Sequence, residues 1–189
     1  MVKEIFLPLD DPAVSALHAG DKILLTGEIY VARDAAHERI VSAIKNGGKP
    51  PFEIAEAAVY YAGPAPVKPG EIIGVIGPTT AGRMDAYTPF LLESGLRVMI
   101  GKGKRSAKVV EAMKKRKAVY LGAAGGAAVL LQSSVTEAET IAWPELGPEA
   151  VLRLKIKQMP LVVVIDCEGN SLYETGQAAA KKLIAETER

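Results

Sequence analysis

The chain has one cysteine, Cys167, and two histidines among its 189 residues. One cysteine cannot close an internal disulfide, and by itself it cannot hold a zinc ion or an iron–sulphur cluster, which need several ligands. Two histidines add little to that supply, so a self-contained transition-metal enzyme is nearly excluded. We therefore expect no metal ligands in this chain.

Long apolar runs and an excess of one charge are also lacking. No apolar run approaches the roughly 20 residues that a membrane span needs, and the first residues reach acid and proline too early for a secretory signal. Lysine and arginine number 23 against 22 aspartate and glutamate, a net charge of +1, so the whole chain is not a polycation. These absences predict a cytoplasmic protein with no membrane partner.

The composition that is present is typical of a folded domain. Hydrophobic residues make up 49% of the chain and charged residues 24%, which argues against disorder. The length predicts a single domain over residues 1–189. Apolar strand-like segments alternate with helix-like segments, so we expect an α/β fold with at least a partly parallel sheet.

The expected elements follow from apolar runs and their Gly and Pro boundaries. Strands are predicted at residues 22–26 with a continuation over 29–32, and at 57–62, 71–76, 96–100, 118–121, 139–143 and 161–166. Helices are predicted from an N-cap at Asp34, from 79–83 to Glu93 with a kink or early boundary at Pro89, after Ser106, and over 177–188. A Gly/Ala-rich stretch at 122–129 permits close approach of a ligand or partner.

Three segments share one pattern, in which a strand ends, small or basic residues follow, and a helix begins. They are residues 32–37, 77–85 and 101–106. Ligands of open α/β sheets bind beyond the carboxyl ends of strands, where helix N-termini present free N–H groups. We therefore expect Arg33, Arg83 and Lys102 to converge on one anion, or on one molecule with two anionic ends.

Ion pairing and solvation are the structural alternatives for the basic residues. Arg33 beside Asp34, and Arg83 near Asp85, can form local ion pairs of little energy. Residues 101–117 carry eight basic residues and one acid, and a solvated helix face explains them better than a nucleic-acid patch. A nucleic-acid-binding module and a self-sufficient binder of carboxylates or phosphates remain as competing hypotheses.

The hydroxyl groups and the histidine also have structural alternatives. Thr79 or Thr80 can be no more than a helix cap, which position alone favours. His37, near a helix start, is either a packed structural histidine or a proton carrier near neutral pH. Residues 77–83 are not a P-loop, because they lack the G-x-x-x-x-G-K-[ST] spacing.

Seven short motifs lie in a fixed order along nearly the whole chain. They are residues 27–39 (G-E-I-Y-V-A-R-D-A-A-H-E-R), 61–64 (Y-A-G-P), 77–85 (G-P-T-T-A-G-R-M-D), 101–103 (G-K-G), 125–128 (G-G-A-A), 143–147 (W-P-E-L-G) and 166–170 (D-C-E-G-N). In these motifs the chain resembles the beta subunit of class I iron–sulphur fumarases and the related L-tartrate dehydratases. Residues 77–85 are the most specific part of the resemblance.

The resemblance implies a swivelling β/β/α-type domain, like the C-terminal domain of the single-chain class I fumarases. It implies a larger alpha subunit, which carries a [4Fe–4S] cluster that this chain does not ligate, and assembly as a dimer of heterodimers. The implied reaction is the reversible hydration of fumarate to L-malate. The close alternative is L-tartrate dehydration, although A-G-R-M-D and R-D-A-A-H look more fumarase-like.

The resemblance also assigns roles to the basic residues. Arg33, Arg83 and Lys102 would bind the two carboxylates of the substrate. Lys102 is preferred to Lys104 because it lies between the paired glycines of the G-K-G motif.

Proton transfer is assigned to a hydroxyl and an imidazole. Thr79 resembles the proposed base that takes the C3 proton, with Thr80 beside it as a second substrate contact. A threonine alkoxide needs nearby cations and a helix N-terminus to be stabilised. His37 would shuttle a proton or orient Asp34.

Overall fold

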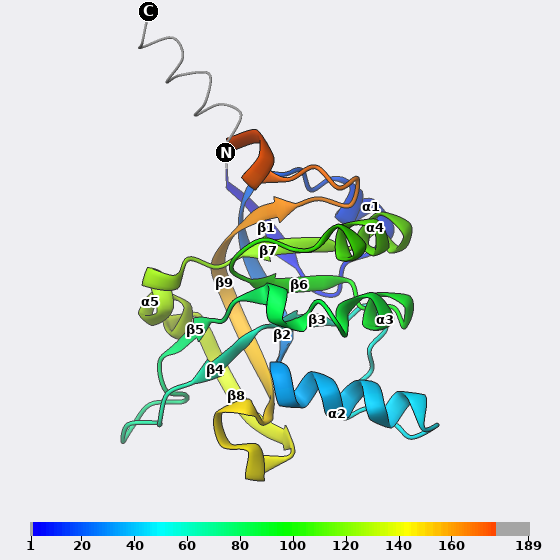
Figure 1. The fold of residues 1–189 in the computed structure, drawn as a ribbon. Helices are drawn as coiled ribbons and strands as arrows, with labels where there is room; N and C mark the ends of the chain where they lie inside the picture. The colour runs from blue at the N-terminus through cyan, green and yellow to red at the C-terminus, as the bar shows by residue number, and fades with distance from the viewer. Residues whose placement is uncertain (1, 177–189) are drawn as a thin grey trace, which may run out of the picture.

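The structure is a computed structural model that describes residues 2–176 (Figure 1). Its strands are β1 (Val2–Phe6), β2 (Lys22–Val31), β3 (Ala58–Tyr60), β4 (Ala62–Pro64), β5 (Ile76–Pro78), β6 (Val98–Gly101), β7 (Val119–Gly122), β8 (Val135–Ala142) and β9 (Val151–Ile165). Its α-helices are α1 (Asp11–Ser15), α2 (Asp34–Lys45), α3 (Thr88–Glu93), α4 (Ala107–Arg116) and α5 (Ala128–Ser133). Three 3₁₀ helices are η1 (Ala81–Met84), η2 (Gly125–Ala127) and η3 (Pro144–Glu149).

Seven of these strands form one mixed sheet in the order β1-β2-β3-β6-β7-β9-β8. The pairs from β1 to β7 are parallel, whereas β9 runs antiparallel to β7, β8 and β2. Because β9 pairs with β2 as well as with β7, the strands β2, β3, β6, β7 and β9 close into a small barrel-like ring. The expected α/β class with a partly parallel sheet is confirmed, and the swivelling type stays a prediction.

The long strand β9 closes this ring because its residues alternate between the core and solvent. Leu154 and Ile156 are buried, while Arg153 and Lys155 between them are exposed. Such alternation places one face of a strand against a core and sets its register. The buried side chains join those of β2, β6 and β7 in one hydrophobic cluster inside the ring.

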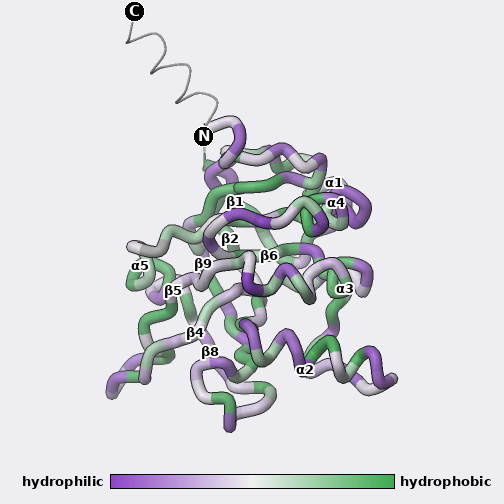
Figure 2. The backbone as a smooth tube through the Cα atoms, viewed as in Figure 1, coloured by the Kyte–Doolittle hydropathy of each residue, from purple (hydrophilic) through white to green (hydrophobic). Residues whose placement is uncertain are grey.

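Three helices cover the outer face of the sheet on one side, as Figure 1 shows for α2, α3 and α4. Their buried residues, including Ile40, Leu92 and Met113, form a second hydrophobic cluster with the outward side chains of the sheet. In Figure 2, hydrophobic residues run along the central strands, and these helices alternate between hydrophobic and hydrophilic residues. None of the helices within residues 2–176 has the length and apolar character needed to cross a membrane.

Some predicted boundaries are wrong. Residues 71–76 do not form a strand: only Ile76 reaches β5, which pairs with β4 in a separate two-stranded hairpin. The single helix expected up to Glu93 is instead η1 followed by α3, and Pro89 stands in the first turn of α3, so the predicted early boundary is confirmed. The N-cap of α2 is Arg33 and not Asp34, which is the first helical residue.

Other elements were absent from the prediction or cannot be compared with it. The strand β1, the short helix α1 and the first ten residues of β9 were not predicted. The expected helix at 177–188 lies outside the described residues.

Gly27 lies at a bulge in the pairing of β2 with β9. The register of the two strands shifts at a bulge between Leu25 and Gly27, and Gly27 has a φ of 139°. A Cβ atom at this position would lie 2.7 Å from the Cβ of Leu7. Only glycine therefore meets both the backbone conformation and the space at this bulge.

We predict that Gly27→Ala lowers the free energy of unfolding by about 2–4 kcal/mol, because it adds backbone strain and a steric clash. Gly126→Ala is the control: its Cβ would meet no atom within 4 Å, and it should change stability by less than about 0.5 kcal/mol. Urea unfolding measures both. Equal midpoints for the two variants would contradict this account of Gly27.

Candidate functional site

Two of the three sequence segments that share the strand-to-helix pattern are joined by backbone hydrogen bonds. The N–H of Thr79 donates to the carbonyl of Tyr61 at 2.7 Å. The N–H of Ala81 donates to the carbonyl of Lys102 at 2.8 Å, and the N–H of Lys102 donates to the carbonyl of Thr79 at 3.3 Å. Thr79 and Thr80 therefore lie between the chain that leaves β3 and the chain that leaves β6, directly before η1 begins at Ala81.

The third segment, at the start of α2, is joined to the others by side chains. Asp34 Oδ1 accepts a hydrogen bond from Arg83 Nε at 2.8 Å, and its Oδ2 lies 3.4 Å from Arg33 Nε. One carboxylate thus holds both arginines. Of the two local ion pairs given as the structural alternative for these arginines, Arg33–Asp34 is present, whereas Arg83 pairs with Asp34 and not with Asp85.

The charge state of Asp34 follows from these neighbours. Partial burial raises its pKa, but a backbone N–H group and the two arginines together hold the pKa below its ordinary value. Asp34 is therefore ionised at neutral pH. The side chain of Arg83 remains 51% exposed, so its guanidinium can also meet a ligand from solvent.

A loop after β8 supports the start of α2. Glu149 Oε1 lies 3.5 Å from Arg33 Nη2, and its Oε2 accepts the N–H of the second residue of α2 at 2.9 Å. Arg39, one turn further along α2, pairs with Glu145 and lies over the Trp143 ring at 5.6 Å. The W-P-E-L-G motif therefore holds α2 through Arg39, and Glu149, two residues after the motif, holds Arg33 at the start of the helix.

The D-C-E-G-N motif also has a structural role. Asp166 is buried and accepts hydrogen bonds from the backbone N–H groups of Ala19, Glu168 and Asn170 at 3.2, 3.1 and 2.9 Å. These bonds close the turn after β9 and tie it to the segment before β2.

The two threonines and the lysine have polar groups that the fold leaves unused. Thr80 is the N-cap residue of η1 by position, but its side chain makes no capping hydrogen bond. Thr79 is half-buried, and Thr80 and Lys102 are exposed. Within the described residues, no hydrogen bond or ion pair involves either hydroxyl or this ammonium group. The three groups are therefore available to a ligand beside Arg83.

His37 lies inside the protein, in the first turn of α2, with an exposed fraction of 0%. Its Nδ1 is 3.0 Å from the carbonyl oxygen of Arg33, its ring meets the edge of Tyr61 at 5.3 Å, and its Nε2 has no partner among the described residues. Burial lowers the pKa of His37 to about 4. The imidazole is therefore neutral at pH 7, with Nδ1–H donating to the Arg33 carbonyl.

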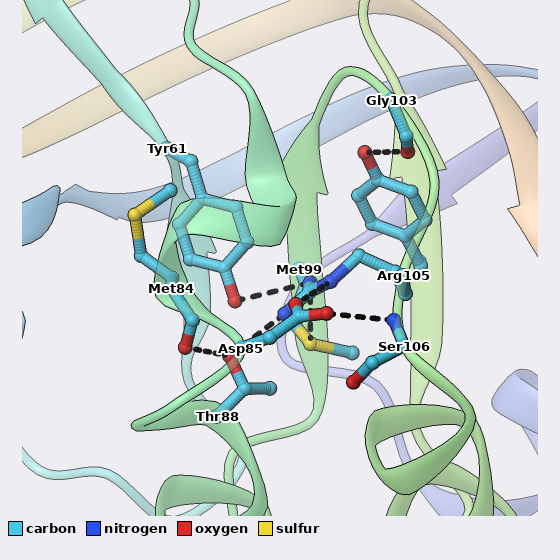
Figure 3. A network of polar contacts seen from close by, with 9 residues as sticks. Tyr61, Met84, Asp85, Thr88, Met99, Gly103, Arg105 and Ser106 are labelled. Atoms are coloured by element: carbon cyan, nitrogen blue, oxygen red, sulfur yellow. Dashed lines mark hydrogen bonds and ion pairs between the residues drawn. The ribbon is translucent and has the colours of Figure 1, made fainter.

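Arg105 is a residue of this region that sequence reasoning missed. Its side chain is 0% exposed, and Figure 3 shows its guanidinium surrounded by partners. Nε donates to Asp85 Oδ1 at 2.7 Å and Nη2 donates to Thr88 Oγ1 at 2.7 Å. The group also lies 5.2 Å from the ring centre of Tyr61 and 5.3 Å from that of Tyr120.

The network extends to the start of α4. Asp85 Oδ2 accepts the N–H of Ser106 at 2.6 Å, and the hydroxyl of Tyr120 donates to the carbonyl of Gly103 at 3.0 Å. The sequence prediction counted Arg105 within a solvated basic helix face, which is wrong for this residue. The signal that could have found it is Asp85, an acid that ends the most specific motif.

The described residues do not fit the ligand set of an iron–sulphur cluster. Within residues 2–176, no three His, Cys, Asp or Glu side chains lie close enough together to hold a metal ion. Cys167 is a single free thiol, whereas such clusters are bound by several thiolates.

Comparison with known proteins agrees with the motifs. The sequence model of the family described as Fumarase C-terminus matches residues 4–176. The chain is 39% identical over 175 residues to the class I aerobic fumarate hydratase of Escherichia coli K12, an alignment that covers 92% of this chain and 31% of that protein. The chain thus spans under a third of the fumarate hydratases that it matches.

Two shorter relatives align over nearly their whole length. The chain is 38% identical over 175 residues to a putative L(+)-tartrate dehydratase subunit beta of Methanocaldococcus jannaschii, covering 89% of this chain and 90% of that protein. It is 34% identical over 192 residues to the L(+)-tartrate dehydratase subunit beta of Escherichia coli K12, covering 98% and 92%. The family match and these alignments show that the chain belongs to the Fumarase C-terminus family.

Proposed function

We propose that this chain is the beta subunit of an iron–sulphur hydro-lyase that reversibly hydrates fumarate to L-malate. The observation that carries the proposal is the junction of Arg33 and Arg83 through Asp34, beside unbonded hydroxyls and Lys102. Membership of the Fumarase C-terminus family supports a small dicarboxylate as the ligand of this cationic site. L-tartrate dehydration is the second candidate, favoured by the near-complete alignment with the tartrate dehydratase subunits.

The basic residues bind the substrate carboxylates in this proposal. A guanidinium group presents two parallel N–H donors that match a carboxylate, and Asp34 holds Arg33 and Arg83 in place before the substrate arrives. Lys102 adds a point charge from the neighbouring segment, which the backbone pairing fixes beside residues 79–81. Fumarate has two carboxylates, which explains why the cations that bind it lie on more than one segment.

Thr79 takes and returns the proton in this proposal. In the dehydration direction, the C3–H bond breaks with its proton passing to the Thr79 oxygen, the C3–H electron pair forms the double bond, and the C2–O bond breaks to release hydroxide. Return of the proton from Thr79 to this hydroxide gives water and restores the anionic oxygen. The threonine oxygen must be an anion for this step. The positive charges of Arg83, in the same segment, and of Lys102, in the paired segment, stabilise that anion. Thr80 is the second hydroxyl contact.

His37 has a positioning role in this proposal. Its Nδ1 hydrogen bond to the Arg33 carbonyl fixes the first turn of α2, which also carries Asp34. Its buried ring supports this role better than a proton shuttle, because a shuttle must reach substrate or water.

The [4Fe–4S] cluster belongs to an alpha subunit in this proposal, and no step assigned to this chain passes through it. Val129 and Leu130 of α5 are 68% and 56% exposed, which suits burial against a partner. The Cβ of Ala128 lies 3.2 Å from where a Cβ of Gly77 would stand, so this helix borders the threonine segment. We further propose a single swivelling domain over residues 1–189, assembly as a dimer of heterodimers, and a cytoplasmic location.

The nucleic-acid hypothesis is weaker than the hydro-lyase proposal. The burial of Arg105 removes one cation from the 101–117 segment. Lys114 lies 3.4 Å from Glu111, and Lys117 lies 3.5 Å from Asp11, so two further cations have acidic neighbours.

We predict that Arg83→Ala lowers kcat/KM of the assembled enzyme by about 100-fold or more, because a charged carboxylate contact is lost. Steady-state rates with fumarate and with L-tartrate measure this and identify the substrate. Arg116→Ala, at an exposed position of α4, is the control and should leave the rates unchanged. Wild-type rates for Arg83→Ala with both substrates would refute the site.

We also predict that His37 makes the fold sensitive to acid. Its pKa is about 4 in the folded chain against 6.5 in the unfolded chain, so between these values only the unfolded chain binds the proton. The contribution of the neutral His37 ring to the free energy of unfolding is therefore complete above pH 6.5. This contribution falls by about 1.4 kcal/mol per pH unit as the pH drops toward 4. Urea unfolding at several pH values measures this slope.

His37→Gln should reduce the change in the free energy of unfolding with pH between pH 6.5 and pH 4, by the amount that corresponds to the binding of about one proton. The same slope in wild type and His37→Gln would show that the ring is not held neutral by burial.

A further inference from the structure

We call the proposed carboxylate-binding residues, with Thr79 and Thr80, the anion site. We infer that Arg105 is a positioning residue for this site, because it holds the threonine–arginine segment, residues 79–85, against the lysine segment, residues 101–106. That the site binds an anionic substrate rests on the proposed function. The contacts by which Arg105 joins the two segments lie within this chain and can be tested without that function. Arg105 does not contact substrate in this account, because its side chain is 0% exposed.

The two segments are joined at both of their ends. At the first end, backbone hydrogen bonds link Ala81 and Thr79 to Lys102. At the second end, Asp85 accepts from Arg105 Nε at 2.7 Å and from the N–H of Ser106 at 2.6 Å. Of the residues proposed to contact substrate, Thr79, Thr80, Arg83 and Lys102 lie at or between these two junctions, so the junctions set where their side chains start.

Each nitrogen of the Arg105 guanidinium lies against a partner group (Figure 3). Nη2 donates to Thr88 Oγ1 at 2.7 Å, and Nη1 lies 3.4 Å from both the hydroxyl of Tyr61 and the sulphur of Met99. The rings of Tyr61 and Tyr120 lie near it, at 5.2 and 5.3 Å between Cζ and the ring centres. A rigid planar fork with each nitrogen engaged fixes the relative place of all these groups.

Lysine cannot reproduce this arrangement, because its ammonium group is a compact point charge without the planar fork. Arg105→Lys therefore keeps the charge opposite Asp85 and loses the contacts to Thr88 and Tyr61. Thr88→Val is a milder change: it keeps the shape of the buried side chain and removes the acceptor of Nη2. Thr88→Ser restores that hydroxyl and is the matched conservative variant.

The first test is amide hydrogen exchange on the isolated chain. In Arg105→Lys and Thr88→Val, the amides of Ala81, Lys102 and Ser106 should exchange about tenfold faster or more, while amides of the β2–β9 ladder keep their wild-type rates. Thr88→Ser should behave like wild type. A uniform rise across the sheet, or no change at the three amides, overturns the locking role.

The second test is steady-state kinetics of the variants assembled with the cluster-bearing subunit. Thr88→Val should lower kcat/KM for the dicarboxylate by about tenfold or more, because carboxylate-binding groups are displaced, and Thr88→Ser should restore most of it. Faster local exchange with wild-type kinetics overturns the positioning role. If the wild-type assembly transforms neither fumarate nor L-tartrate, the proposed function fails, and exchange alone decides whether Arg105 locks the segments.

Discussion

The buried ion pair between Arg105 and Asp85 is the interaction on which the arrangement of the anion site depends. A guanidinium placed inside a protein is costly unless each donor finds a partner, and here carboxylate, hydroxyl and aromatic groups surround it. Removing one partner leaves an uncompensated charge, so the pair favours a single geometry of the loops that carry it. Asp85 also accepts a hydrogen bond from the N–H of Ser106, the N-cap residue of α4, so the same carboxylate orients that helix.

A second constraint comes from the closure of the sheet. The antiparallel strand β9 pairs with both β2 and β7, and this ring brings the carboxyl ends of β2, β3 and β6 to one edge. The arginine at the start of α2 and the lysine after β6 reach the same region only because these ends are neighbours. The loop after β8 then holds α2 in place through Glu149, which contacts Arg33 and the helix N-terminus.

The sequence was sufficient for features that depend on local pattern. The alternation of apolar strands and amphipathic helices predicted the mixed α/β class, and the G-P-T-T-A-G-R-M-D motif predicted the family. Features that depend on distant contacts were missed. Arg83 pairs with Asp34, 49 positions away. It does not pair with Asp85, two positions away, whose two carboxylate oxygens accept from Arg105 and from the N–H of Ser106. Residues 152–157 alternate apolar and basic side chains, which is a local strand pattern that the prediction overlooked. Residues 71–76 are apolar enough for a core strand, yet they lead into a hairpin outside the main sheet.

The central claim is that this chain supplies the carboxylate-binding part of a hydro-lyase whose cluster lies on another subunit. The most direct measurement is anaerobic affinity purification of the tagged chain from its native lysate, followed by iron analysis and assays of fumarate hydration and L-tartrate dehydration on the eluate. The account predicts an iron-containing partner and the formation of malate from fumarate. Oxaloacetate from L-tartrate without malate formation would select the second candidate. A solitary chain without iron and without either activity would contradict the claim.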